Sequence, residues 1–472
     1  MMQIPDRFNY NEDFSDILKQ FDEMLTFDRA RYFDVEIFTE IITYLIDTNQ
    51  KDKARLALKI GLRQHPHAEE LILKDAQFSI ITQNFSRAKN ILKDLLNTNK
   101  ADAEIYYYLG KLQLATNKLN KSIRYFDAAL TLAEIDEKIS LLYMITDDMM
   151  DKGEYHSAVN YLHQILEIDH YDFEALIDLG TCYKELNQIT RAIEEFDHYL
   201  DKDPFNEMIW YQLGTLYEHE NNAEMAVDSY EFAIAIEPEY SSAYFSLALI
   251  HSRKEEYDKA IKYLEELLTY ESKNLHAFFY LAESYYQTGQ KDLAMINFEK
   301  TLSIDPEFAD AWFGIGEIYY DENKIAESLL YIRKAIKLDP EEPLFWLRLA
   351  TIQQSMKELS YAIKSYNKVI NLDPYDEKAR LHLAECHFEL KEYNKTGQIC
   401  NTALETFYDP AFYYLWGTAL IESGQKDQGL SKIENGLKKD HEAFDRFVYF
   451  YPKILSFDAV KKLVNLYQGL EE

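Results

Sequence analysis

Apolar residues recur along most of the chain at intervals of three and four positions, with polar residues between them. One example occupies Trp312, Ile315, Gly316 and Tyr319 in a first segment, and Ile325, Leu329, Ile332 and Ala335 in a second. Such spacing places apolar side chains on one face of an α-helix, because one helical turn takes about 3.6 residues. The pattern therefore predicts pairs of amphipathic helices joined by short turns.

The helix pairs recur with a period of 34 residues. Small residues mark one position of the repeat at Ala76, Gly110, Gly180, Gly214, Ala248, Ala282, Gly316, Ala350, Ala384 and Gly417. Ile42 and Thr146 complete the series. The spacing slips twice, to 36 before Thr146 and to 33 before Gly417. Self-similarity at a fixed period is typical of a repeat protein, and we predict twelve repeats over about residues 35–443.

A second small residue follows twelve positions after the first, as Ala226 follows Gly214. Small side chains at both positions let the two helix backbones of a repeat approach closely. Proline ends six of the repeats, at Pro66, Pro204, Pro238, Pro306, Pro340 and Pro374. Because proline has no amide hydrogen and disfavours helix in the residue before it, it separates one repeat from the next.

This organisation resembles the tetratricopeptide repeat family. The family's pattern of aromatic, small and proline positions is matched by Trp210, Leu213, Gly214, Tyr217, Ala226, Tyr230, Ala233 and Pro238. The resemblance implies an all-α fold, a right-handed superhelical α-solenoid of about twelve 34-residue helix-turn-helix repeats with capping helices. We predict an N-terminal segment with a capping helix in residues 1–34, the solenoid in 35–443, and C-terminal capping helices in 444–472.

The two ends of the chain depart from the repeat pattern. In residues 14–27 one helical face carries Phe14, Ile17, Leu18, Phe21, Met24 and Leu25. This face is expected to cover the open end of the first repeat, since a terminal repeat lacks a neighbour. Near the other end stand Phe444, Phe447, Tyr449, Phe450 and Tyr451. Packing inside a C-terminal cap is favoured for these rings, and a contact in a homodimer is the alternative.

Composition and charge exclude several classes of function. The 472 residues include 82 acidic and 50 basic side chains, which gives a net charge of −32. This charge repels nucleic acid and anionic membrane surfaces. No run of about 18 apolar residues predicts a membrane span, and residues 1–13 lack the apolar stretch of a secretion signal. With only three cysteines, the chain is predicted to be cytoplasmic.

No motif predicts catalysis, a metal site or a cofactor. Gly314 and Gly316 lie inside a predicted helix, whereas a dinucleotide-binding loop follows a strand. Cys386, His387 and Cys400 lack the paired ligand spacing of zinc sites, and we interpret them as buried thiols beside a surface or groove histidine. Acidic residues are abundant, but acid–base catalysis needs a closed pocket that a smooth solenoid rarely supplies. We therefore predict that the protein is not an enzyme.

The resemblance also implies where a partner binds. In this family the second, fifth, ninth and twelfth positions of each repeat line a concave groove, and these positions share one helical stripe. In residues 207–390 they include Tyr211, Phe245, Phe279, Glu283, Tyr286, Phe313, Glu317, Tyr320, Glu385 and Phe388. Some of these rings are expected to pack against the next repeat instead. The remainder predict an aromatic floor with acidic walls, suited to a partner segment with basic residues and apolar anchors.

The predicted function is a non-catalytic intracellular scaffold that binds a protein or peptide in this groove. A self-associating architectural subunit and an accessory subunit of an enzyme complex are the alternatives. The clamp with which some members of the family bind chaperone tails needs Lys at the fifth and Asn at the ninth position, and no repeat carries that pair. The basic exceptions, such as Arg348 and Lys111, are isolated.

Overall fold

The computed structural model describes residues 12–27, 31–170 and 172–468, and every regular element within these ranges is a helix. Through residue 236 the helices are α1 (Glu12–Phe27), α2 (Val35–Asp47), α3 (Lys51–Gln64), α4 (Glu69–Ile81), α5 (Phe85–Thr98), α6 (Ala103–Ala115), α7 (Leu119–Leu132), α8 (Ile135–Asp151), α9 (Tyr155–Ile168), α10 (Phe173–Glu185), α11 (Ile189–Leu200), α12 (Glu207–His219) and α13 (Ala223–Ile236). The later helices are α14 (Ser241–Arg253), α15 (Tyr257–Tyr270), α16 (Leu275–Gln287), α17 (Lys291–Ile304), α18 (Ala309–Asp321), α19 (Ile325–Leu338), α20 (Pro343–Ser355), α21 (Leu359–Leu372), α22 (Glu377–Glu389), α23 (Tyr393–Ala403), α24 (Ala411–Glu422), α25 (Lys426–Lys439), α26 (Glu442–Phe450), the 3₁₀ helix η1 (Pro452–Ser456) and α27 (Asp458–Gln468).

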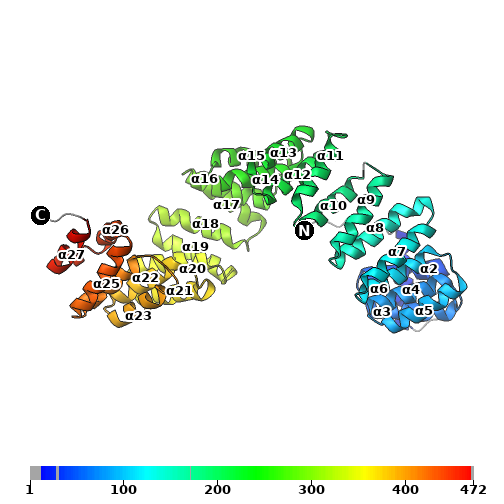
Figure 1. Cartoon of the computed structure of the whole chain (residues 1–472), viewed down its shortest axis with the longest axis horizontal. Coiled ribbons are helices and arrows are strands. Elements are labelled where there is room, and N and C mark those ends of the chain that lie inside the picture. Colours follow the sequence, from blue (N-terminus) through cyan, green and yellow to red (C-terminus); the bar gives the residue numbers. More distant parts are fainter. Residues whose placement is uncertain (1–11, 28–30, 171, 469–472) are drawn as a thin grey trace. The chain divides into compact units, whose positions relative to one another are not determined.

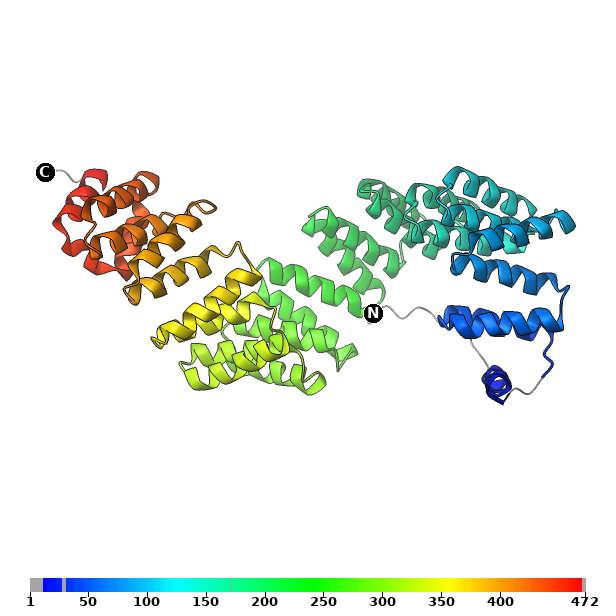
Figure 2. The ribbon, with the colours of Figure 1, turned by 90° about the horizontal axis from the view of Figure 1, so that it is seen from below.

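Consecutive helices pack as pairs, from α2 with α3 through α24 with α25, and Figures 1 and 2 show the pairs from two sides. These twelve pairs correspond to the twelve predicted repeats. The all-α fold and the helix-turn-helix unit are thereby confirmed. We call the first helix of a pair the first helix of its repeat.

One residue in the left-handed backbone region joins the two helices of each repeat. The set is Asn49, Gln83, Asn117, Gly153, Asn187, Asn221, Glu255, Gly289, Asn323, Lys357, Lys391 and Gly424. Its members lie 34 residues apart except for steps of 36 to Gly153 and 33 to Gly424, so both slips predicted from the sequence occur in the backbone. The left-handed residue lets the next amide bond back into the ending helix, as Gln290 N does to Tyr285 O at 2.8 Å.

The small residues lie where the paired helices approach each other. A Cβ added at Gly214 would be only 2.5 Å from Cε1 of Tyr230, and one at Gly316 would be 2.8 Å from Cγ1 of Ile332. Ala226, twelve positions after Gly214, is fully buried. The close approach of large side chains to these glycines explains why a period of small residues was visible in the sequence.

Three tryptophans tie the turns between repeats to the helices that follow. Each donates its indole N–H to the carbonyl of the proline six positions earlier, at 2.9 Å in every case. The pairs are Trp210 with Pro204, Trp312 with Pro306, and Trp346 with Pro340. Because these prolines lie in turns between helices, their carbonyls have no intrahelical donor, and the indole bonds satisfy them and hold the turn.

The helices form two compact units, Met1–Ile236 and Glu237–Glu472, which we call the N-terminal unit and the C-terminal unit. In the N-terminal unit, α1 buries Phe14, Phe21 and Met24 in a cluster that includes Phe38 of the first repeat. This is the arrangement expected of a capping helix, which covers apolar surface that has no preceding repeat.

In the C-terminal unit, α26 and α27 cover the last repeat. Phe444 and Phe447 are buried against Tyr414 of α24, with ring centroids 5.0 and 5.6 Å from the tyrosine ring. Tyr449 is 82% exposed, and the side chain of Phe450 lies outside the described residues. Two of the aromatic residues considered for a homodimer contact are therefore packed within their own chain.

Candidate partner-binding site

The C-terminal unit presents a surface formed by the first helices α16, α18 and α20, which we call the C-terminal face. Its described members at the predicted groove positions are Phe279, Glu283, Tyr286, Phe313, Glu317 and Tyr320, all half-buried. The fifth-position rings pack on one side and are open on the other. Phe313 stacks on Phe345 at 4.8 Å, and Phe279 lies 5.1 Å from Phe308 and 6.0 Å from Phe298.

One acidic residue of this face is neutralised within the chain. Arg348 of α20 donates from Nη2 to Oε2 of Glu317 at 2.5 Å, and its guanidinium lies 4.9 Å from the ring centroid of Tyr320. Arg348 is therefore engaged by an acidic residue of its own chain. The two residues are 31 positions apart, which joins position nine of one repeat to position six of the next. That spacing is the signal by which the pair could have been found.

The Glu317–Arg348 pair leaves polar atoms unsatisfied. Within the described residues, Oε1 of Glu317 and Nε of Arg348 are buried and make no hydrogen bond. Burial raises the pKa of Glu317, while its hydrogen bond with Arg348 opposes that shift. Buried polar atoms without a partner are uncommon, so this pair is only partly satisfied within the chain.

Tyr286 also has an internal partner. Its hydroxyl donates to Oδ2 of Asp321 at 2.9 Å, and Lys291 Nζ lies 3.1 Å from the same oxygen. Burial, followed by the bond to Asp321, raises the pKa of the tyrosine. The phenol therefore stays neutral near neutral pH.

Glu283 differs from the other acidic residues of the face. Among the described residues it has no hydrogen-bond donor and no ion-pair partner. Burial raises its pKa to about 7, and the carboxylates of Asp310 and Glu317 on α18 add to the shift. Glu283 lies one helical turn after Phe279, so the ring and the carboxylate share one side of α16. A cation placed there would be attracted to a carboxylate that the chain itself leaves unneutralised.

Tyr211 and Phe245 lie elsewhere. Phe245 of α14 contacts Tyr280 of α16 edge to face at 5.6 Å, so it adjoins the C-terminal face. Tyr211 belongs to α12 of the N-terminal unit, where its ring lies 5.3 Å from that of Tyr230. Of the predicted groove residues, Tyr211 therefore belongs to the N-terminal unit and Phe245 to the C-terminal unit.

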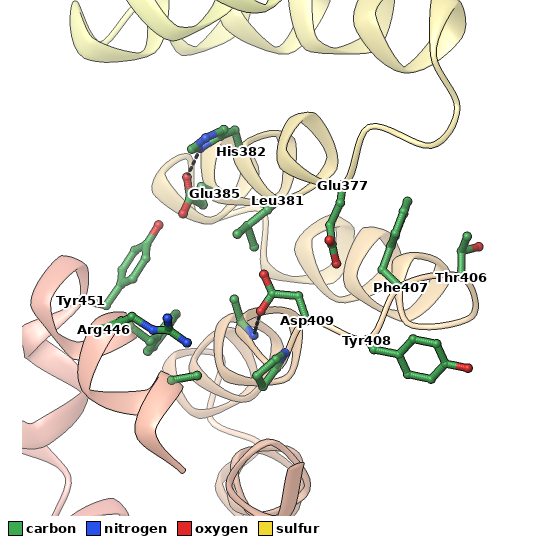
Figure 3. A pocket seen from close by; sticks show the side chains of 14 residues that line it. Glu377, Leu381, His382, Glu385, Thr406, Phe407, Tyr408, Asp409, Arg446 and Tyr451 are labelled. Atoms are coloured by element: carbon green, nitrogen blue, oxygen red, sulfur yellow. Dashed lines mark hydrogen bonds and ion pairs between the residues drawn. The ribbon is translucent and has the colours of Figure 1, made fainter. Parts of the chain in front are cut away.

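The last two predicted residues line or flank a pocket at the end of the C-terminal unit. Glu385 of α22 is held by His382 Nδ1 at 2.8 Å and by Gln354 Nε2 at 3.4 Å. Phe388 lies edge-on to Tyr451, 5.7 Å between ring centroids, so the segment after α26 covers it. The pocket beside them has a volume of about 780 Å³ and is drawn in Figure 3.

Sequence reasoning did not find this pocket. Its walls are α22, the segment 406–411 and α26 with Tyr451 after it, which lie up to about 70 positions apart in the chain. The pocket arises because α26 follows the last repeat as if it were a further first helix, packing against α24. The aromatic residues around 444–451 were interpreted only as a cap or a dimer contact, although that cap also forms a wall.

The N-terminal unit has a corresponding surface, the N-terminal face, which includes Tyr107, Lys111, Tyr143, Asp148 and Asp172. Lys111 Nζ lies 2.5 Å from Oδ1 of Asp148, and the Tyr107 hydroxyl donates to Oδ2 of the same carboxylate at 2.7 Å. The Tyr143 hydroxyl donates to Asp172 at 2.5 Å. Lys111, like Arg348, is therefore paired with an acidic residue of its own chain.

The described residues contain no group of three or more His, Cys, Asp or Glu side chains able to hold a metal ion. All three cysteines are buried, and burial raises the pKa of Cys182 and Cys386 to about 12. His387 was expected at the surface or in the groove, but it is buried and bonds Glu392 at 2.6 Å. None of the helices in the part of the chain that the structure describes is long and apolar enough to cross a membrane.

Comparison with known families identifies the class of protein. Tetratricopeptide repeat families match residues 103–136, 149–213, 309–342 and 344–376. The tetratricopeptide repeat domain of cytochrome c-type biogenesis protein H matches residues 198–308. The chain is a tetratricopeptide repeat protein.

One curated relative and several solved structures are similar to parts of it. Anaphase-promoting complex subunit 3 of Dictyostelium discoideum is 29% identical over 113 residues, which are 24% of this chain and 11% of that protein. The match thus spans about a tenth of the relative's length. MamA is 26% identical over 37% of this chain and 96% of its own, with a TM-score of 0.32. Yeast Tom70 is 15% identical over 88% of this chain and 94% of its own, with a TM-score of 0.40. YrrB, described as a tetratricopeptide repeat protein with an unusual peptide-binding site, is 22% identical over 39% of this chain and 95% of its own, with a TM-score of 0.35.

Proposed function

We propose that this protein is a non-catalytic, cytoplasmic scaffold that binds a protein partner on the C-terminal face. Tetratricopeptide repeat proteins mediate protein–protein interactions, and their fold is typical of scaffolds without catalytic activity. The observation that carries the proposal is Glu283, a half-buried carboxylate with no donor or cation among the described residues, next to the half-buried ring of Phe279.

The chemistry of the face defines the partner. Phe279 and Phe313 offer apolar surface, and Glu283 and Asp310 offer negative charge beside it. An extended or helical segment with an apolar residue and a nearby Lys or Arg would satisfy both. Burying one apolar side chain contributes about 1.5–3 kcal/mol, whereas the charges mainly raise the association rate and exclude acidic partners.

Binding to this face can be tested with a random library of twelve-residue peptides selected on the full chain. The affinity of the selected peptides is then measured by fluorescence anisotropy. Changing both Phe279→Ala and Phe313→Ala should weaken binding by at least about tenfold, because two apolar anchors are lost. Leu330→Ala is the matched control, since Leu330 is 68% exposed on the second helix α19 and should leave affinity unchanged.

Two results would contradict the proposal. If the selected peptides bound the double phenylalanine variant as tightly as the native chain, they would bind elsewhere on the protein. An affinity that stays constant between low and high salt would show that the acidic residues do not contribute, since attraction between exposed charges is screened by salt. Circular dichroism of the double variant must match the native chain, because a loss of helicity would place the rings in the core.

A subunit of a larger assembly is the second candidate. It is favoured by the match of 113 residues to a protein named as a subunit of the anaphase-promoting complex. Affinity purification of the full chain followed by mass spectrometry tests this role. Recovery of a stoichiometric set of chains supports it, and light scattering that shows only a monomer after gentle purification argues against it.

A further inference from the structure

The pocket at the end of the C-terminal unit, which we call the C-terminal pocket, has three walls. The first helix α22 contributes Glu377, Leu381, His382 and Glu385; the segment before α24 contributes Thr406, Phe407, Tyr408, Asp409 and Pro410; the cap contributes Ala443, Arg446, Phe447 and Tyr451. Figure 3 shows these side chains around a common space. A volume of about 780 Å³ is larger than one side chain needs, so it suits a side chain together with part of the backbone that carries it.

Most polar groups of the C-terminal pocket are already engaged. Glu385 accepts bonds from His382 and Gln354 and also from Tyr451. Arg446 lies 3.6 Å from Asp440, and its side chain is 78% exposed, which places it at the rim. These groups satisfy one another and have little left to offer a ligand.

Two carboxylates are the exception. Within the described residues, Glu377 has neither a hydrogen-bond donor nor an ion-pair partner. Asp409 uses only Oδ1, which accepts the amide of Ala411 at 2.8 Å and so helps to begin α24. In Figure 3 both carboxylates reach toward the same space, Glu377 from α22 and Asp409 from the segment opposite. The two negative charges are thus directed together and lack an internal counter-charge.

The walls between the carboxylates are apolar. Leu381 points into the space from α22 in Figure 3, and Phe447 and Ala443 line the side of the cap. A ligand for this lining needs a cationic end and an aliphatic stem. Lys and Arg combine the two, because their methylene chains pack on apolar surface while the charged group reaches a polar site. An anionic ligand would meet the unpaired carboxylates and is disfavoured.

We propose that the C-terminal pocket receives a lysine or arginine side chain of a partner segment, held between the carboxylates of Glu377 and Asp409. This inference rests on the proposed scaffold function and assigns it a second contact point in the same unit. The stem lies on Leu381 and Phe447, and the charged group completes the unused hydrogen-bonding capacity of both carboxylates. Arginine fits this role best, since its guanidinium can donate to two carboxylates at once.

The test uses the full chain and the peptides selected from the twelve-residue library. Glu377→Gln and Asp409→Asn each remove a charge with little change of shape, and Asn can still accept the amide of Ala411. Each change should weaken binding of a peptide containing Arg or Lys by about tenfold. Glu405→Gln is the matched control, because Glu405 is exposed nearby and does not line the pocket. Its affinity should equal that of the native chain.

A charge reversal at Glu377 tests directly whether this carboxylate contacts the basic residue of the peptide. Glu377→Arg should bind the original peptide at least as weakly as Glu377→Gln, and should regain affinity for a peptide in which the critical basic residue is replaced by Glu. Such a rescue supports the proposed contact, since a general disturbance of α22 would weaken both peptides. Circular dichroism and thermal unfolding confirm that the variants fold.

Three outcomes would overturn the inference, and they differ in what they say of the scaffold function. The pocket contact would be overturned if the selected peptides contained no basic residues. It would also be overturned if their affinity were unchanged by Glu377→Gln and Asp409→Asn but reduced by the changes at Phe279 and Phe313. Either result would leave the C-terminal face as the binding site. Enrichment of acidic peptides that depend on Arg446 would assign the pocket to the opposite charge. If the library yields no binder at all, both proposals fail.

Discussion

The N-terminal and C-terminal units are built from the same repeat, yet their acidic residues differ in whether a cation of the chain neutralises them. On the N-terminal face Asp148 is neutralised by Lys111 and accepts the hydroxyl of Tyr107. In the C-terminal unit Glu283 and Glu377 have no such partners among the described residues. The same fold thus carries acidic residues that the chain neutralises, such as Asp148 and Glu317, and others that the described residues leave without a cation.

Aromatic residues at the fifth repeat position also differ between the two units in how far they are buried. Tyr107 occupies the fifth position of its repeat and is only 3% exposed, with its ring against those of Tyr108 and Phe126. Phe279, at the equivalent position in the C-terminal unit, is half-buried. Sequence position therefore does not determine whether a ring belongs to the core, because the neighbouring side chains decide how much of it is covered.

The largest expected loss of stability concerns the small residues at which the paired helices approach each other in both units. Gly214→Leu in the N-terminal unit and Gly316→Leu in the C-terminal unit should each destabilise by about 3 kcal/mol, because even a Cβ would lie 2.5 and 2.8 Å from its neighbour. Urea unfolding monitored by circular dichroism measures the change. Gly153→Ala would show only the cost of a left-handed backbone, since nothing lies within 4 Å of its Cβ position. Unchanged stability of either leucine variant would contradict the register of that unit.

A smaller loss of stability is expected to distinguish the ion pairs of the two faces. Lys111→Met should destabilise by about 2 kcal/mol, because Asp148 has a side chain only 14% exposed and would lose its counter-charge. The comparison in the C-terminal unit is Lys291→Met, which removes a more exposed pair with Asp321 and should cost less than about 1 kcal/mol. Equal losses in urea unfolding would mean that the faces do not differ in how they use internal cations.

The smallest expected effect is a gain of stability, whereas the changes above are expected to destabilise the protein. Burial raises the pKa of Glu283 to about 7 from an ordinary value of 4.5, so the folded chain favours the protonated carboxyl. Stability from this group is present below about pH 4.5 and is lost as the pH rises toward 7. Glu283→Gln should therefore stabilise the protein by about 1–2 kcal/mol at pH 8 and leave it unchanged at pH 4.

Urea unfolding at the two pH values measures this difference. The control is Glu307→Gln, at an exposed position before α18, which should leave stability unaltered at either pH. Destabilisation of Glu283→Gln at pH 8 would show that the native carboxylate has a favourable partner, and the contrast between the two faces would no longer hold.

Much of the fold could be predicted because its determinants are local. A small residue every 34 positions predicted each helix pair, and the slips of 36 and 33 reappear in the left-handed residues that join the helices. The capping helix of residues 14–27 followed from its apolar face. Helical periodicity and turn conformation depend on residues close in sequence, so they can be recognised without knowing the rest of the chain.

The candidate site was less accessible to such reasoning. Phe279, Glu283 and Phe313 were selected by their repeat positions, but position could not distinguish Glu283 from Glu317. Arg348 neutralises Glu317, whereas the residues that the structure describes offer Glu283 no partner. The choice depends on which side chain of the next repeat comes within reach. That contact joins residues 31 positions apart and is set by the packing of one repeat on another.

The sequence by itself determined the repeat class, the register and the surplus of acidic residues, because each is expressed in local patterns or in composition. Only the tertiary structure decided which carboxylates remain without a counter-charge and that α22, the segment before α24 and α26 enclose a pocket. The physical reason is that charge pairing and cavity formation depend on distances between side chains far apart in the chain. Those distances exist only once the helices have packed.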